Sequence, residues 1–163
     1  MSTAAEEIIA LELISRLENI TVLNGYAFNV ESVSRVNRDS TEWTPRDRAI
    51  VVSQDATQRN EEADRPGNPA AIGYTVAFRI FGFRRQSDRA ATADAAKVNE
   101  MHAAIKKAVA NDTDWHQFNR TSYDANWGPT TPFNSPDGRH AGLSVELTVH
   151  FRVDEDDPFT VRV

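Results

Sequence analysis

The clearest pattern in the chain is a strict alternation of apolar and polar residues near its end. In residues 143–153, "LSVELTVHFRV", every odd position is apolar and every even position is polar. Residues 72–83, "IGYTVAFRIFGF", alternate in a similar way, with Arg79 as the one charge on the opposite side. Such alternation predicts two long strands that each place one face in the core. The shorter β-branched run "AIVVS", residues 49–53, predicts a buried strand.

Two other segments have the apolar spacing of amphipathic helices. The first is residues 3–18, which opens with Thr3 and Glu6 at capping-box spacing. The second covers about residues 88–110. Their apolar stripes consist of Ile9, Leu13, Leu17 and Ile20 for the first helix, and of Ala91, Ala95, Val98, His102, Ile105 and Val109 for the second.

A turn and a further strand are expected after the first helix. The dipeptide Asn24–Gly25 is a turn signal. Beyond it, Tyr26, Phe28 and Val30 alternate with small or polar residues, and Val33 and Val36 follow in a different phase. This pattern predicts a strand that is bulged or ends near Ser32.

The other connections are long and rich in turn-forming residues: they are residues 37–48, 54–71 and 119–142. Loops of more than about 12–15 residues are usually functional or disordered, and we expect these to be ordered by a neighbouring subunit. Within the third, Trp127 is either an interface anchor or a residue that packs back onto its own domain. Trp115 and Phe118, just before it, are expected to cap the core.

The order of these elements predicts one α+β domain over residues 1–163. We expect a mixed or antiparallel sheet on which the N-terminal helix and one long central helix pack, with long loops between them. Apolar residues make up 40% of the chain and charged residues 26%, as in ordinary globular proteins, so a core of normal size is expected.

Charge and cysteine content narrow the function. The net charge of -6 argues against a dominant nucleic-acid-binding surface. The chain has no cysteine, which excludes disulfides and thiolate metal sites. No apolar run approaches the roughly 20 residues that cross a bilayer, and the N-terminus carries acid where a secretory signal carries base. We therefore expect folding in a cytoplasm and no contact with a membrane.

Candidate chemical groups are scattered along the chain. The four histidines, His102, His116, His140 and His150, have no second ligand at a recognised metal spacing. The run "DEDD", residues 154–157, could attract a hard cation, but a solvated end of the last strand is the preferred interpretation. No serine lies in a nucleophile elbow, and no glycine-rich phosphate loop occurs. We predict no catalytic, cofactor-binding or metal-binding residues.

Basic and aromatic residues alternate where the predicted strand 72–83 leads into the predicted helix 88–110. Residues 78–89, "FRIFGFRRQSDR", could bind single-stranded nucleic acid, but the acidic chain around them favours a protein contact or a local ion-pair patch. With the aromatic residues of the third long connection, this gives a candidate interface of Trp127, Tyr123, Phe133, Arg84, Arg85 and Arg89.

Four segments, taken in order, resemble one protein family. They are "AAEEIIALELISRLENI" leading into "YAFNVESVSRVNRDS", then "AIVVSQDATQ", then "IGYTVAFRIFGF" leading into "DRAATADAAKVNEMHAAIKKAVANDTDW", and finally "LSVELTVHFRVDEDDPF" with Asp157–Pro158. Over its whole length the chain is similar in pattern to the tail terminator, or tail-completion, proteins of tailed bacteriophages. The connections 54–71 and 119–142 look longer than a minimal member needs.

The resemblance implies a non-enzymatic structural protein of the virion tail or neck, assembled in the host cytoplasm. Family members form a ring, typically a homohexamer, at the head-proximal end of the tail tube. The implied partners are the tail tube protein and the head–tail connector or stopper, and the genome passes through the lumen without specific binding. An acidic ring suits such passage, because a strongly basic pore would hold DNA.

Two other classes stay open. A head-closure or minor tail protein of the same particle would share the small α+β architecture. A small α+β enzyme or ligand-binding domain, with Asp114 and His116 beside residues 119–142 as a lid, ranks last because no residue spacing indicates a catalytic arrangement. The sequence leaves open the ring number, the tube-facing side and whether the tail contracts.

Overall fold

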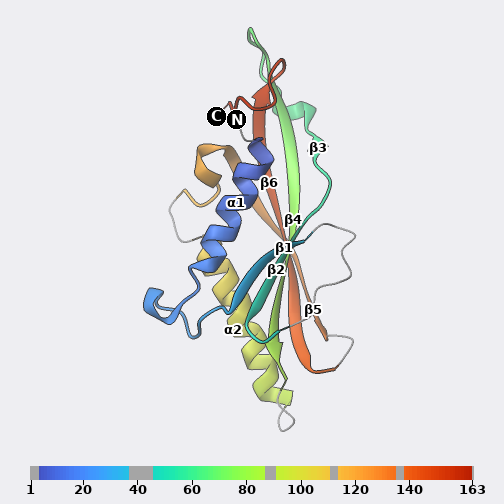
Figure 1. The fold of residues 1–163 in the computed structure, drawn as a ribbon. Coiled ribbons are helices and arrows are strands. Elements are labelled where there is room, and N and C mark those ends of the chain that lie inside the picture. The colour runs from blue at the N-terminus through green and yellow to red at the C-terminus, as the bar shows by residue number, and fades with distance from the viewer. Residues whose placement is uncertain (1–3, 37–45, 87–90, 111–113, 135–137, 163) are drawn as a thin grey trace.

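The computed structural model shows a mixed six-stranded sheet with helices packed on it (Figure 1). It describes residues 4–36, 46–86, 91–110, 114–134 and 138–162, with the backbone alone for 91–93. The elements are α1 (Ala5–Glu18), β1 (Ser32–Val36), β2 (Ala49–Gln54), β3 (Gln58–Arg59), β4 (Ala71–Arg85), α2 (Ala91–Val109), β5 (Ser122–Asn134) and β6 (His140–Asp154). This architecture confirms the expected α+β class.

The sheet is built around the pairing of β4 with β6. Its strand order is β1-β2-β4-β6-β5, and β3 pairs with β4 beside this path. β1 and β2 are parallel, whereas the other pairs are antiparallel. The β4–β6 ladder runs from Ala71 opposite Asp154 to Arg85 opposite His140. Both predicted long strands are therefore confirmed, and each is longer than its alternating segment.

The core lies between one face of this sheet and the two helices. Val76 and Ile80 of β4 lie opposite Val149 and Val145 of β6, and all four are fully buried. The helices contribute the buried residues Ile9, Leu13, Leu17, Met101, Ile105 and Val109. The opposite face carries no described α-helix, and only the short 3-10 helix Glu61–Ala63 packs near one end of it, so the sheet has a helix-covered face and an open face (Figure 1).

The buried side of α2 differs from the predicted stripe. Ala95 is exposed, and Met101 is completely buried although it was not assigned to the stripe. Gly82 of β4 explains the shift, because a Cβ atom there would lie 2.5 Å from Cγ of Met101. The missing side chain lets Met101 approach the sheet, and the helix is rotated toward that gap.

Residues 26–31 are not a strand, although their alternation predicted one. β1 begins at Ser32, where the predicted strand was expected to end. Tyr26 and Phe28 are nevertheless buried against the core, and Val30 N–H donates to Ile20 O at 2.8 Å. The alternation therefore reports which side chains are buried in an extended segment that has no strand partner.

The third long connection contains a strand and is not a loop. Residues 122–134 form β5, which pairs with β6 at the edge of the sheet. Pro129 and Pro132 have no N–H to donate and are tolerated because one side of this strand has no strand partner among the described residues. The pairing register shifts between Trp127 and Thr130, the interval that contains Gly128 and Pro129. Proline and glycine thus mark a bulged edge strand.

Smaller expectations have mixed outcomes. The N-cap of α1 is Ala4 and has no side-chain cap, so the capping box was wrong, and Thr3 itself lies outside the described residues. The turn at Asn24–Gly25 is present, with Gly25 at a φ of 80°. Residues 37–45 and 87–90 also lie outside the described residues. Residues 54–71 contain β3 and a short 3-10 turn, Glu61–Ala63, so this connection has structure of its own.

Candidate functional site

The aromatic residues of the predicted interface lie on one strand but on different faces of the sheet. Trp127 is on the helix-covered face, where its ring stacks on Trp115 with centroids 5.8 Å apart and an interplanar angle of 19°. Nζ of Lys106 lies 5.5 Å from the Trp127 ring centroid. Trp127 therefore packs back onto its own domain, and Trp115 and the fully buried Phe118 cap the core as expected.

Tyr123 lies on the open face and covers a buried cation. The guanidinium carbon of Arg152 is 3.8 Å from the Tyr123 ring centroid. Arg152 is buried, and its Nε donates to Ala63 O at 2.6 Å. The Tyr123 ring also lies 6.1 Å from the His150 ring. These contacts give Tyr123 a structural role at the end of the sheet where Ala71 meets Asp154.

Phe133 lies at the other end of the open face. Its ring makes edge contacts with Phe81 and Phe83, with centroids 6.0 Å and 5.4 Å apart. Gly142, directly opposite, leaves room for it, because a Cβ atom there would lie 2.8 Å from Phe133 Cζ. These phenylalanines form a small apolar cluster outside the main core, in which Phe83 is buried while Phe81 and Phe133 are partly exposed.

The basic residues of the predicted interface also separate. The Arg84 side chain is only 11% exposed, and its guanidinium carbon lies 4.6 Å from the Phe28 ring centroid. It forms ion pairs of 3.6 Å with Asp47 and Glu100. Arg85 is exposed, while Arg89 lies outside the described residues. The ion-pair interpretation of this corner therefore holds for Arg84.

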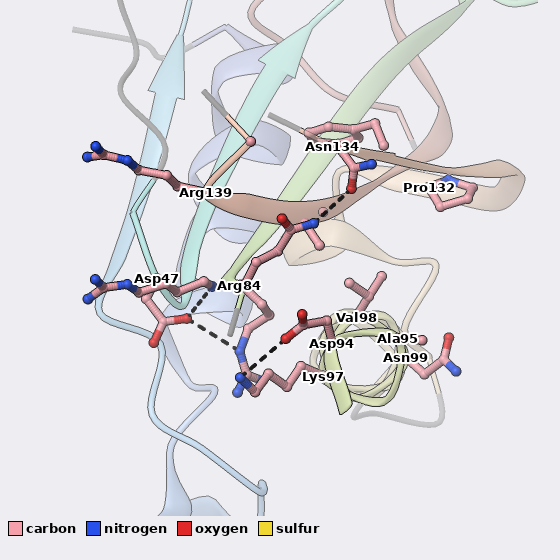
Figure 2. Close-up of a pocket in the computed structure, with 16 residues that line it drawn as sticks. Asp47, Arg84, Asp94, Ala95, Lys97, Val98, Asn99, Pro132, Asn134 and Arg139 are labelled. Atoms are coloured by element: carbon pink, nitrogen blue, oxygen red, sulfur yellow. Dashed lines mark hydrogen bonds and ion pairs between the residues drawn. The ribbon is translucent and has the colours of Figure 1, made fainter. Parts of the chain in front are cut away.

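An open depression brings three of the six predicted residues together (Figure 2). It lies where β4 ends, β6 begins and α2 and β5 pass nearby. We call it the basic depression, and it is lined by Arg84, Arg85, Lys97, Arg139, Asp47, Asp94, Val98, Pro132 and Phe133, among others. Gln86 Nε2 donates to Asn134 Oδ1 at 3.1 Å and joins the ends of β4 and β5 at its edge.

Sequence reasoning missed Lys97 and Arg139 as parts of this depression. Arg139 falls in the segment predicted to be a loop, but β6 begins at His140, directly opposite Arg85. A signal was present, because Asp137–Gly138 is a typical hairpin dipeptide and Gly138 has a φ of 66°. A hairpin assignment would have placed Arg139 beside the end of β4.

The chain folds back at the opposite end of the β4–β6 ladder. We call residues 155–161 the C-terminal turn. Asp154 N–H donates to Thr160 O at 3.0 Å, and Val153 forms a bridge with Val161. Phe159, 46% exposed, is at the tip, and Glu155, Asp156 and Asp157 are exposed beside it.

Asp157 organises the C-terminal turn. Its carboxylate accepts hydrogen bonds from Thr160 Oγ1 at 2.6 Å and from Phe159 N–H at 3.0 Å. These bonds, the Thr160 hydroxyl first, hold the pKa of Asp157 below its ordinary value. The solvated interpretation of "DEDD" is right for the last three acids and wrong for Asp154, which is buried and paired with Arg162.

A second turn follows α1 (Figure 1), and its apolar side chains are exposed. Leu23 is 98% exposed in the 3-10 turn Val22–Asn24, and Val22 is also exposed. Asn29 Oδ1 accepts from Val22 N–H at 2.7 Å, and Lys107 Nζ donates to Gly25 O at 2.9 Å. The turn is therefore held in one shape from both sides.

The histidines are separately placed, and the described residues contain no cluster of three or more metal-ligating side chains. His102 is half-buried, as expected for a boundary residue, with Nε2 3.2 Å from Thr130 Oγ1. Burial, and then the charge of Lys106, lower its pKa. Nδ1 of His150 lies 3.1 Å from Thr75 Oγ1 on the open face.

The arrangement suggested for an enzyme is not present. Residues 122–134 are a strand, so they are not a lid over Asp114 and His116. The His116 ring contacts the Trp115 ring, with centroids 6.2 Å apart, and the His116 carbonyl accepts from Ser122 Oγ at 2.5 Å. These contacts tie His116 to the packing around Trp115.

No family model matches the chain, and no curated protein matches it. None of the helices in the described ranges combines the length and apolar character that a membrane crossing requires.

Proposed function

We propose that the protein is a tail terminator of a phage-like particle. In this role it is a structural protein without catalysis that forms a ring, typically of six copies, on the end of the tail tube. The ring stops polymerisation of the tube and offers a docking surface to the head connector. The proposal rests on the resemblance of the four ordered segments to this family.

The structural observation that carries the proposal is the open face of the sheet. Thr75, Thr148 and His150 form a half-exposed polar strip across the β4–β6 ladder, and Arg79 forms ion pairs there with Asp55 at 3.7 Å and Glu146 at 3.4 Å. An exposed sheet face of mixed polarity suits packing against other protein chains, because neither desolvation nor like charge opposes contact strongly.

Tube assembly tests the proposal directly. Purified tail tube protein is polymerised with and without this chain, and tube lengths are measured by negative-stain microscopy. We expect capped tubes of fixed length when the chain is present. Tubes that keep growing while the chain stays unbound would refute the terminator role.

A matched pair of variants tests the part played by the open face. Thr148→Lys adds a charge in the middle of this face, whereas Ser15→Lys adds the same charge at an exposed position of α1. We expect Thr148→Lys to abolish capping and Ser15→Lys to preserve it. Equal capping by both variants would show that the open face makes no essential contact.

A neck or minor tail protein of the same particle is the second candidate. Such a protein would bind the head connector and leave tube growth unchanged, so the same assembly experiment separates the two roles. The enzyme class stays last, because the residues suggested for it serve local packing.

A further inference from the structure

The two ends of the β4–β6 ladder carry opposite charge. The basic depression lies at the end where Arg85 meets His140, and the C-terminal turn lies at the end where Ala71 meets Asp154 (Figure 1). Each strand has 15 residues, and at ~3.3 Å per residue the ladder is roughly 50 Å long. The two surfaces therefore cannot meet within one copy.

The basic depression has the character of a receptor for an acidic group with an apolar tip. The lining residues described above include four basic side chains and two acidic ones. Arg84 is engaged by Phe28, Asp47 and Glu100, and Lys97 forms an ion pair of 3.6 Å with Asp94. The exposed side chains of Arg85 and Arg139 lie at the rim. Val98 and Pro132 supply apolar surface between them, whereas the Phe133 ring is directed to the open face.

The C-terminal turn has the complementary character. It presents three carboxylates around one aromatic ring, and no basic residue occurs from Asp154 to Val161. The hydrogen bonds of Asp157 and the bridge between Val153 and Val161 fix the turn before any contact is made. A preformed turn loses little conformational entropy on binding.

We propose that the C-terminal turn of one copy docks in the basic depression of the next copy. The Phe159 ring packs on Val98 and Pro132, and the carboxylates of residues 155–157 face Arg85, Lys97 and Arg139. The contact is heterologous, so each copy takes part in two contacts through different surfaces. Repetition closes into a ring when the rotation between copies permits it. The inference rests on the proposed function for its place in a tail, but the two surfaces alone define the contact.

Two charge-reversed variants test the contact. Glu155→Lys with Asp156→Lys alters only the turn, and Arg85→Glu with Arg139→Glu alters only the rim of the depression. All four side chains are exposed, and thermal unfolding verifies that both variants fold. We expect wild-type oligomers in analytical ultracentrifugation, and a dissociation constant raised about tenfold or more in either variant or when salt reaches ~1 M.

Mixing the variants distinguishes this contact from a symmetric one. One variant keeps an intact depression and the other keeps an intact turn, and the reversed turn also complements the reversed rim. A one-to-one mixture should therefore form mixed oligomers, although neither variant forms them alone. A single chain with all four substitutions should regain oligomers. Oligomers of wild-type strength in either variant alone would overturn the inference.

If the wild-type contact is too weak to be detected by ultracentrifugation, cysteine trapping can still test it. The chain has no cysteine, so Phe159→Cys and Val98→Cys introduce the only thiols. We expect intermolecular disulfides between these two positions and none between Val98→Cys and a control Ser15→Cys. A chain that is monomeric at about 1 mM and gives no Phe159→Cys to Val98→Cys disulfide overturns the inference.

Failure of the inference and failure of the proposed function have different signatures. Variants that lose the contact but still cap tubes would leave the proposed function standing without this interface. Oligomers that form through the contact but ignore the tail tube would leave the interface standing without the proposed function.

Discussion

The indole rings of Trp115 and Trp127 stack on each other with centroids 5.8 Å apart, which joins the segment after α2 to the edge strand β5. Both rings pack partly against the core. This stack is a main contact of β5 with the helix-covered side, because much of the rest of the strand is exposed.

Trp127→Ala should lower the free energy of unfolding by about 1–3 kcal/mol, through lost burial and stacking. Trp127→Phe should retain most of the stability because an aromatic ring remains. Chemical denaturation measures both, and a double-mutant cycle with Trp115→Ala should show a coupling energy of about 0.5–1.5 kcal/mol. Additive effects would mean that the stack contributes nothing specific.

Gly82→Ala should lower the free energy of unfolding by roughly 1–3 kcal/mol, because the added methyl group overlaps Met101. Met101→Ala in the same chain makes room for that methyl group. The double variant should therefore lose less stability than the sum of the two single variants. A strictly additive result in denaturant titrations would show that Gly82 does not set the position of α2.

The carboxylate of Asp64 should make stability depend on acid. It accepts from Gly73 N–H at 2.8 Å and from Arg59 Nη2 at 2.7 Å, and these bonds, the Gly73 one first, lower its pKa. A lowered pKa in the folded state stabilises the protein above the ordinary aspartate pKa of about 3.9, and this contribution disappears as the pH falls through the folded value.

The measurement is the thermal midpoint of Asp64→Asn and of wild type as a function of pH. The variant should melt lower at neutral pH, and the gap should close in acid. Asp156→Asn, at an exposed position, is the matched control and should follow wild type throughout. A gap that stays constant with pH would rule out the carboxylate as its cause.

His102 should make the protein less stable as the pH falls. Its pKa is lowered in the fold, so the unfolded chain binds a proton more readily, and stability declines below the ordinary histidine pKa of about 6.5. His102→Gln should flatten the change of the unfolding free energy between neutral and mildly acidic pH. Lys106→Gln should flatten it less, because burial is the larger cause. An unchanged slope in both variants would contradict this assignment.

Leu23→Asp should leave stability within about 0.5 kcal/mol of wild type, because the side chain is 98% exposed. Leu17→Asp, in the core, should unfold the protein. If the apolar turn contacts a neighbouring copy or the tail tube, Leu23→Asp should fold normally and fail to cap tubes. Normal capping by this variant would show that the turn makes no contact that capping requires.

The sequence was informative where one pattern had one cause. Residues 72–83 and 143–153 alternate because one side of each strand is buried, and both were predicted correctly. At Tyr26 and Phe28 the same pattern arises without a strand partner, since side-chain burial alone produces it. In residues 122–134, glycine and proline masked a strand because edge strands tolerate both.

The aromatic residues of the candidate interface lie on different faces of the sheet, and the apolar–polar pattern of one strand could not predict this. Tyr123, Trp127 and Phe133 all occupy odd positions and would share one face of a regular strand. The register of β5 shifts between Ser122 and Asp124 and again between Trp127 and Thr130. Each shift exchanges the two faces, so Trp127 lies toward the helices while Tyr123 and Phe133 lie on the open face. Bulge positions depend on the partner strand, which the alternation of one strand does not specify.

The β4–β6 ladder also limits how early the protein can fold during its synthesis. Its two strands are separated in the chain by the whole of α2 and β5, so the centre of the sheet consists of distant pairings. Such pairings are slow, because the intervening chain must be closed into a loop before any contact forms. During synthesis α1, β1, β2 and β4 leave the ribosome first and must wait, with an apolar strand edge uncovered, for the last segment to arrive. We therefore expect the yield of folded protein to fall as the expression temperature rises.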